Sequence, residues 1–423
     1  MPHASKPRIF TPSFLALASC NFLGAMNFYL LTAIFTEYSL KTFDLPYSTA
    51  ALSVSLYIIG ALAARILLGA QIDRWGIKRS LVVGYGVIAI TSCLYVAPLP
   101  FPLLVGIRFV QGLGFGVSSS AGASGAALLV PSERRGEGIG YFSMTQALAT
   151  GIGPFVAMLL INVTGTYQML FAVTAAMAVA MTAMSVFVRL PDPRARELTH
   201  RLDNVDAALP AREENDEPQG AAAQFASRFL HMKVVPFGLV MLLVYLCYSG
   251  LITYMSLYAE SLDAAGTASL YFVVYAAAIL LSRPPMGRMA DSRGENSVMR
   301  LTLPCLAAGL VLLGAAGVWH LSALLLVSAA LTGFGVGSTH SVLQAVVPKV
   351  VPASQIGRGN STYLMMLDLG SGIGPVLLGL LLPVSGYAAM YFLLAGVALA
   401  ALVLYYAVYG IRFGGSPAER VDD

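Results

Sequence analysis

The chain has 423 residues, of which 57% are hydrophobic and 11% are charged. Soluble domains carry roughly 25% charged residues, so this chain has more apolar surface than one water-facing core could bury. The composition excludes an ordinary soluble domain and predicts a protein embedded in a lipid bilayer. The formal net charge is +4, and it gives no reason to expect a nucleic-acid partner.

Apolar stretches of membrane-spanning length follow one another along the whole chain. A spanning helix needs about 20 mainly apolar residues. The predicted spans cover residues 12–36, 47–69, 80–97, 101–128, 138–162, 167–189, 234–258, 266–286, 298–317, 321–347, 356–382 and 387–411. Six of them lie in each half of the chain. We therefore predict an all-α membrane protein with twelve transmembrane helices.

The only long polar stretch separates these two sets of spans. Residues 190–233 include the highly charged run 212–218 and then alanine-rich sequence, a composition typical of a linker. The predicted domains are an N-terminal six-helix bundle over residues 1–189, a cytoplasmic linker over 190–233 and a C-terminal six-helix bundle over 234–423.

The two halves carry the same motif. Residues 65–76 (RILLGAQIDRWG) and 283–294 (RPPMGRMADSRG) share an arginine, two glycines and an aspartate at a displacement of 218. Further glycines and prolines recur at a displacement of 221, with Gly112, Gly114, Gly116, Pro131, Gly153, Pro154 and Gly165 matching Gly333, Gly335, Gly337, Pro352, Gly374, Pro375 and Gly386. Such a repeat is typical of transporters built from two related bundles around a midplane site. We predict two pseudo-symmetric six-helix bundles.

Lysine and arginine residues orient the predicted spans. With the N-terminus inside, one set of loops carries Arg74, Lys78, Arg79, Arg134, Arg135, Arg288, Arg293, Arg300, Lys349 and Arg358. The loops on the other side carry only Lys41. Because basic loops stay in the cytoplasm, we predict that both termini are cytoplasmic. We expect a multi-pass protein of a bacterial cytoplasmic (inner) membrane.

The repeated motif lies at predicted cytoplasmic helix ends and suggests a gate. Glycines there permit close helix approach and a tight turn, and an aspartate can cap backbone amides or pair with a basic neighbour. The predicted gating residues are Arg65, Gly69, Asp73, Arg74, Gly76, Lys78, Arg79, Arg283, Gly287 and Asp291. They would hold the inward gate shut and separate as the halves rock. Alternatively, these charges mark the bilayer boundary.

Among the charged residues inside predicted spans, where each costs roughly 2.5–3.5 kcal/mol, Asp368 and Arg108 stand out. Asp368 lies near the midplane of its span, and its counterpart in the other half is Ala147. An acid there can alternate between protonated and anionic forms, so Asp368 is the predicted proton-coupling residue, with a structural hydrogen bond as the alternative. Arg108, whose counterpart is Ala329, could bind a substrate carboxylate, modulate an acid or clamp a backbone carbonyl.

Other polar and aromatic residues of the spans could line a cavity. The predicted substrate-binding residues are Asn27, Arg108, Gln111, Phe115, Gln146, Tyr248, Tyr254, Tyr275, His340, Gln344 and Tyr363. Each could instead join helices, since polar groups also do so in membranes. Glu37, at the outer end of the first span, is expected to be exposed to solvent.

The sequence carries no catalytic constellation, and we expect no enzyme activity and no cofactor. Its four cysteines, Cys20, Cys93, Cys247 and Cys305, all lie within predicted spans, which favours neither disulfides nor a metal site. No phosphate-binding G-x-x-x-x-G-K-(S/T) loop is present, so transport would use an ion gradient or the gradient of the substrate.

The whole chain resembles the major facilitator superfamily. The loop signature of that family usually reads G-x-x-x-D-(R/K)-x-G-(R/K)-(R/K), and residues 69–79 match it except that Ile77 replaces the first basic residue after the second glycine. Residues 108–112 (RFVQG) resemble the second motif of the family. Gly153 and Pro154 resemble the core of its antiporter motif, with Ala149 and Ala157 in place of flanking glycines.

Within that superfamily, Arg65, Arg283 and the sequence 368–370 (DLG) look most like a bacterial branch of drug and metabolite exporters that includes metallophore exporters. The resemblance implies a proton-coupled antiporter that exports a small amphipathic or polar organic compound by alternating access. The expected partners are a small-molecule substrate, protons and membrane lipid, and the expected state is a monomer. The alternatives are a proton-coupled importer or facilitator of a sugar or organic acid, and a membrane receptor without transport.

Overall fold

The computed structural model describes residues 9–131, 134–190, 230–351 and 356–410, and it leaves out a few side chains within these ranges, among them those of residues 69–74. This part of the chain is helical and contains no strand. Eleven of its helices are long and apolar enough to cross a membrane. The elements are α1 (Pro12–Phe43), α2 (Tyr47–Trp75), α3 (Ile77–Leu94), α4 (Phe101–Leu129), α5 (Arg135–Thr164), α6 (Tyr167–Phe187), α9 (Val235–Ser261), α10 (Ala265–Arg293), α11 (Glu295–Trp319), α12 (Ala323–Val350), α13 (Ile356–Tyr405) and the π-helical η3 (Tyr406–Gly410).

Helix α1 shows how the local sequence sets these bounds. The side chain of Thr11 accepts a hydrogen bond from the Phe14 amide at 3.2 Å, and Pro12 takes a first-turn position, where its missing N–H leaves no partner unsatisfied. At the other end, Asp44 adopts a left-handed conformation with φ of 49°, and its N–H donates to the Leu40 carbonyl at 3.0 Å.

Positive φ angles recur in the register of the sequence repeat. Gly76, between α2 and α3, has φ of 85°, and Gly294, between α10 and α11, has φ of 79°. A residue with a Cβ would be strained in this conformation, which explains why both copies of the motif end in glycine. Asp44 and Asp263, which follow α1 and α9, also share a left-handed conformation, with φ of 49° and 51°.

Helix α13 is interrupted at Gly386, whose φ of 72° and ψ of 173° are not helical. Gly386 is the repeat counterpart of Gly165, which has φ of 67° and separates α5 from α6. The interruption lies between the last two predicted spans, 356–382 and 387–411. The 50 residues of α13 therefore contain two helical segments that meet at this glycine.

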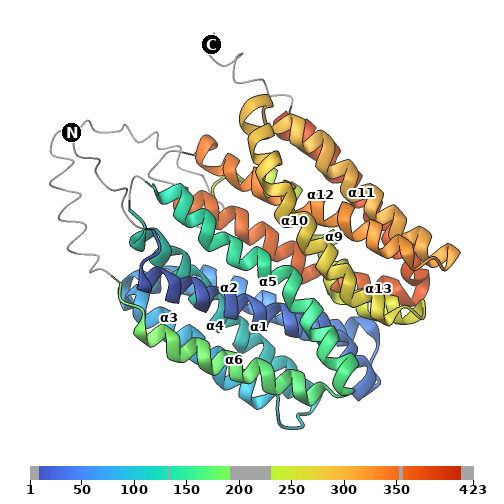
Figure 1. The fold of residues 1–423 in the computed structure, drawn as a ribbon, viewed down its shortest axis with the longest axis horizontal. Helices are drawn as coiled ribbons and strands as arrows, with labels where there is room; N and C mark the ends of the chain where they lie inside the picture. The colour runs from blue at the N-terminus through green and yellow to red at the C-terminus, as the bar shows by residue number, and fades with distance from the viewer. Residues whose placement is uncertain (1–8, 132–133, 191–229, 352–355, 411–423) are drawn as a thin grey trace, which may run out of the picture.

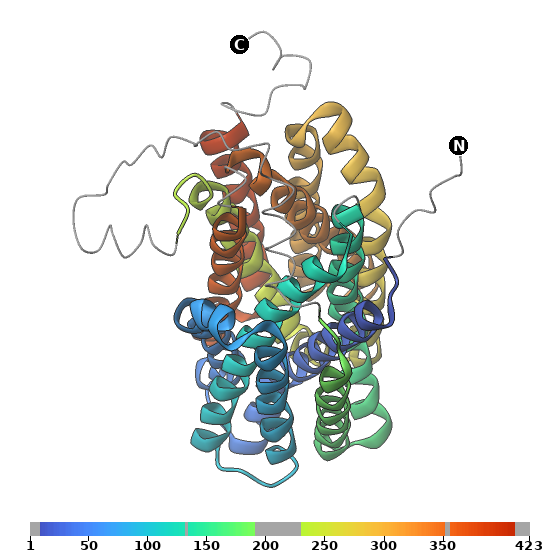
Figure 2. The ribbon, with the colours of Figure 1, turned by 90° about the vertical axis from the view of Figure 1, so that its left-hand side faces the viewer.

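The helices form two groups that lie side by side (Figures 1 and 2). Helices α1 to α6 make up the first half and α9 to α13 the second half. Helix α2 packs against α13, and α5 packs against α10, across the boundary between the halves. One buried apolar cluster extends through both, and includes Tyr29 of α1 and Tyr248 of α9.

Close helix contacts also repeat between the halves. A Cβ at Gly112 of α4 would collide with the Tyr57 carbonyl of α2, and a Cβ at Gly333 of α12 would collide with the Tyr275 carbonyl of α10. These four residues obey the sequence repeat, with displacements of 221 for the glycines and 218 for the tyrosines. Glycine lets the backbones approach this closely, and the same device holds the corresponding helix pair in each half.

We use "motif end" for the end of the molecule that carries the Gly76 and Gly294 turns. The "opposite end" carries the Asp44 and Asp263 turns. The predicted linker over 190–233 lies almost entirely outside the described residues, which resume at residue 230.

Candidate functional site

An ion pair joins the two halves inside the helical bundle. The guanidinium group of Arg65 on α2 contacts the carboxylate of Asp368 on α13, and the two side chains are 16% and 14% exposed. Arg65 also donates from Nη2 to the Ser119 Oγ of α4 at 3.4 Å. A single charge would be costly inside a membrane. Pairing Arg65 with Asp368 reduces this cost for both residues.

The sequence placed Arg65 in the predicted gate and Asp368 in the predicted proton site, but it did not predict that they meet. The available signal was that two opposite charges lie within spans of different halves. That signal does not say which charges pair, because the two residues are 303 positions apart. The structure brings the two predicted sites together at one contact.

Arg108 is enclosed within the first half. Its side chain is fully buried, with Nε donating to the Ser53 carbonyl at 2.7 Å and Nη1 donating to Gln111 Oε1 at 2.9 Å. Its Cζ lies 4.6 Å from the ring centroid of Phe35 and 4.5 Å from that of Tyr57. Aromatic faces stabilise a cation at this distance, whereas the Nη2 atom of Arg108 is buried with no hydrogen-bond partner in the described part of the chain.

Gln111 extends the hydrogen bonds of Arg108 into a network. It accepts from the Tyr95 hydroxyl at 2.9 Å and donates to Ser92 Oγ at 3.0 Å. Asn27 on α1 accepts from Gln111 Nε2 at 3.4 Å and donates to the Thr174 carbonyl of α6 at 2.9 Å. The structure therefore brings three predicted substrate-binding residues together, in contacts that also join α1, α2, α3, α4 and α6.

A second polar cluster lies in the second half around His340 of α12. The Nδ1 atom of His340 lies 3.4 Å from the hydroxyls of both Tyr245 and Tyr363, and Tyr363 also donates to the His340 carbonyl at 2.9 Å. Tyr248 and Tyr275 stack nearby, with ring centroids 6.1 Å apart. Both hydroxyls are buried, and that of Tyr275 has no hydrogen-bond partner in the described part of the chain.

The remaining predicted substrate-binding residues are dispersed. Tyr254 donates to the Pro375 carbonyl at 2.5 Å, and Phe115 stacks on Phe28 with centroids 5.8 Å apart. Gln344 is half-buried on α12, and Gln146 is exposed on α5. Gln146 interacts with Tyr29, which also interacts with Tyr248 beside the His340 cluster.

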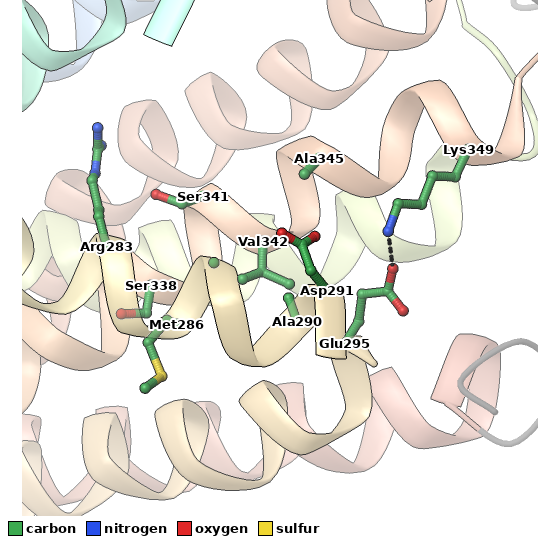
Figure 3. Close-up of a pocket in the computed structure, with 11 residues that line it drawn as sticks. Arg283, Met286, Ala290, Asp291, Glu295, Ser338, Ser341, Val342, Ala345 and Lys349 are labelled. Atoms are coloured by element: carbon green, nitrogen blue, oxygen red, sulfur yellow. Dashed lines mark hydrogen bonds and ion pairs between the residues drawn. The ribbon is translucent and has the colours of Figure 1, made fainter. Parts of the chain in front are cut away.

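A cavity of about 110 Å³ lies at the motif end of the second half (Figure 3). Helices α10, α11 and α12 supply its lining, which includes the predicted gating residues Arg283, Gly287 and Asp291. At one side Lys349 Nζ donates to Glu295 Oε1 at 2.6 Å. The second copy of the motif therefore borders a cavity as well as a turn.

The first copy of the motif is only partly described. The surroundings of Gly69 and the side chains of Asp73 and Arg74 are outside what the structure describes, whereas Lys78 and Arg79 are exposed at the start of α3. The predicted contacts of Asp73 therefore stay a prediction.

Glu37 was expected to be exposed, and this expectation was wrong. Its side chain is 7% exposed, and it accepts hydrogen bonds from Lys41 at 3.1 Å, from Tyr167 at 3.0 Å and from Ser256. Lys41 also pairs with Glu260 at 2.8 Å. The contacts involve α1, α6 and α9, so this network joins the two halves at the opposite end. In the sequence, only the spacing of Glu37 and Lys41 hinted at it.

The fold and these polar sites define a multi-pass helical membrane protein with charged contacts between two halves. The sequence profile of the Major Facilitator Superfamily matches residues 17–272 and 237–420. The chain belongs to this superfamily of membrane transporters.

Similar sequences come from bacteria. An uncharacterized MFS-type transporter of Burkholderia mallei (strain SAVP1) is 24% identical over 380 residues, which cover 87% of this chain and 86% of that protein. The uncharacterized MFS-type transporter YfiU of Bacillus subtilis (strain 168) is 25% identical over 160 residues, which cover 38% of this chain and 31% of YfiU.

Solved structures share the fold at low sequence identity. The nucleoside transporter NupG aligns with a TM-score of 0.69 at 14% identity, covering 94% of this chain and 99% of NupG. The peptide transporter POT in complex with sulfate aligns with a TM-score of 0.71 at 16% identity, covering 95% of each chain.

Proposed function

We propose that this protein is a proton-coupled secondary transporter that exports a small amphipathic or polar organic compound by alternating access. The observation that carries the proposal is the ion pair between Arg65 and Asp368, because it joins the halves through a group that can bind a proton. Both side chains are partly exposed, so water can exchange protons with the pair.

Protonation of Asp368 would couple to movement of the halves. A neutral carboxyl group attracts Arg65 far less than a carboxylate does, so a proton on Asp368 weakens a contact across the boundary. The proton and the arrangement of the halves then influence each other through one coupling free energy. During export, Asp368 would take up a proton when it faces the outside and release it when it faces the cytoplasm.

The architecture proposed for this cycle has twelve spans in two pseudo-symmetric six-helix bundles, over residues 1–189 and 234–423. The interruption at Gly386 supports counting α13 as two spans, and the matched contacts of Gly112 and Gly333 support related bundles. The transport cavity would lie between α1, α4, α9 and α12, with both termini and the 190–233 linker in the cytoplasm.

The repeated motif would form the cytoplasmic gate of this transporter. The cavity beside Gly287 and Asp291 leaves space for the second copy to move, which supports a gate over a simple boundary marker. As in the drug, metabolite and metallophore exporters that the sequence resembles, the protein would act as a monomer in a bacterial inner membrane. Arg108 would hold α2 and α4 together, or modulate the proton site, through its buried contacts.

Flux measurements with the purified protein in liposomes test the proposal. In liposomes where uptake mimics export, an outward-directed proton gradient, with an acidic lumen, should drive uptake of a drug or metabolite substrate, and collapse of the gradient with a protonophore should stop accumulation. Flux that is indifferent to an imposed pH gradient would instead indicate a facilitator.

A further inference from the structure

Two contacts between the halves have the same register. Ile58 of α2 lies against Gly372 of α13, where a Cβ on the glycine would be 3.2 Å from the isoleucine side chain. Ala276 of α10 lies against Gly151 of α5 in the same way. Ala276 is displaced from Ile58 by 218 residues, and Gly372 from Gly151 by 221. The two boundaries between the halves therefore match residue by residue at these positions.

This register identifies a pair of equivalent positions. Arg65 follows Ile58 by seven residues, and its partner Asp368 precedes Gly372 by four. In the other boundary, Arg283 follows Ala276 by seven residues, and Ala147 precedes Gly151 by four. The first arginine thus faces an acid across the boundary, whereas the equivalent of that acid for Arg283 is an alanine that is 5% exposed.

Arg283 consequently has no anionic partner in the described part of the chain. Its Nε is buried without a hydrogen-bond partner, and the neighbours with which it interacts electrostatically are Tyr29, Tyr245 and His340. Figure 3 shows its side chain pointing away from the carboxylate of Asp291. A cation inside a membrane span is costly unless a partner compensates it.

We propose that Arg283 binds the anionic group of an organic substrate, and that this group takes the place that Asp368 takes beside Arg65. The inference names the substrate class of the proposed transporter and so rests on the proposed function. A guanidinium group binds a carboxylate through two parallel hydrogen bonds. The rings of Tyr29 and Tyr245 beside it offer apolar surface for the body of the compound.

Binding of matched probes tests this site without any transport. The purified protein in lipid nanodiscs is titrated with 2-naphthoate and with 2-naphthamide, and with 4-phenylbutyrate and 4-phenylbutyramide. The wild type should bind each carboxylate about tenfold or more tightly than its amide, since a hydrogen bond to a charged group has about that effect. Arg283→Gln should abolish the preference, whereas Arg288→Gln, which changes an exposed arginine of the same helix, should retain it.

A second pair of variants tests the register itself. Ala147→Asp supplies the missing acid and should remove the carboxylate preference, whereas Ala147→Asn, of equal size and without charge, should keep it. A wild type without carboxylate preference, or an Arg283→Gln variant that retains it, would overturn the inference. Because binding needs no proton gradient, these results are separate from the flux result that tests proton coupling.

Discussion

At the residue scale, Arg65 and Arg283 show how arginines at equivalent positions of a repeated fold can have different roles. Both are the first residue of the repeated motif, yet among the described residues only Arg65 meets an acid of the other half. The difference comes from a single position, Asp368 in one half and Ala147 in the other. Matching small residues give the two halves the same helix packing. A charge that is present in one half and absent from the other can determine proton coupling and substrate specificity.

Asp368→Asn should separate substrate movement from proton coupling. The amide has the shape of a protonated carboxyl and cannot become an anion, so the variant should exchange substrate across a liposome membrane but should not accumulate it along a pH gradient. Accumulation ratios and counterflow in the same liposomes measure the two activities. An Asn variant that still concentrates substrate in a pH-dependent way would exclude Asp368, and attention would move to Glu37 or His340.

At the element scale, the helix pairs α2–α4 and α10–α12 are fixed by glycines that allow backbone contact. A side chain at such a position must push the helices apart, whereas a glycine that faces open space carries no such restriction. Helix α4 contains both kinds, because a Cβ at Gly112 would collide with α2 while a Cβ at Gly106 would have no neighbour within 4 Å.

Gly112→Ala should therefore destabilise the protein, and Gly106→Ala should not. Overpacking costs typically about 1–3 kcal/mol, more than the gain of about 0.5–1 kcal/mol when alanine replaces glycine in a helix. Thermal unfolding of both variants in the same detergent gives the comparison. If the melting temperature of Gly112→Ala equalled that of Gly106→Ala, the close approach of α2 and α4 would not contribute to stability.

The elements were predictable from sequence because apolar length and glycine spacing are local patterns. The matched turns at Gly76 and Gly294 follow from the repeat, and the interruption at Gly386 lies between two predicted spans. The polar contacts were less predictable. Arg108 was located, but its enclosure by Phe35 and Tyr57 depends on how three helices pack, which no local pattern specifies.

The same limit explains the error at Glu37. Its partners Tyr167 and Ser256 are 130 and 219 residues away, so a charge near a span end looked exposed when read alone. The pairing of Arg65 with Asp368 was missed for the same reason. A single sequence states which charges need partners, and the packing of distant helices decides which partners they find.

At the scale of the whole molecule, contacts at different depths between the halves must break and form in turn for alternating access. The Arg65–Asp368 pair lies within the bundle, and the Glu37 network lies at the opposite end. The repeated motif lies at the motif end. Each contact can shift the equilibrium between two arrangements of the halves. The size of the shift is the difference between the free energies of that contact in the two arrangements.

Asp73→Asn tests the motif end through kinetics. If Asp73 stabilises the closed gate through one charged hydrogen bond, its loss should slow turnover by about tenfold and change substrate affinity much less. Asp291→Asn should have a milder effect. Transport rates and equilibrium binding are measured on equal amounts of purified protein, and unchanged turnover in Asp73→Asn would argue against the gate.

Glu37→Gln tests the opposite end through the population of conformations. Glu37 is 7% exposed and receives three hydrogen bonds, so neutralising it should weaken closure by about 1.5 kcal/mol or more, a shift of about tenfold in the equilibrium. Glu260→Gln is the matched control. The Glu260 side chain is 51% exposed in its pair with Lys41, and exposed ion pairs contribute only about 0–1 kcal/mol.

Spin labels on the two halves can report this shift. Val163 at the end of α5 and Trp319 at the end of α11 are 76% and 65% exposed, so cysteines there can be labelled in a background without native cysteines. Pulsed electron spin resonance should show a larger population of long distances in Glu37→Gln than in Glu260→Gln or the parent. Identical distance distributions in all three proteins would mean that the Glu37 network does not hold the opposite end closed, and that apolar packing between α1 and α9 does so instead.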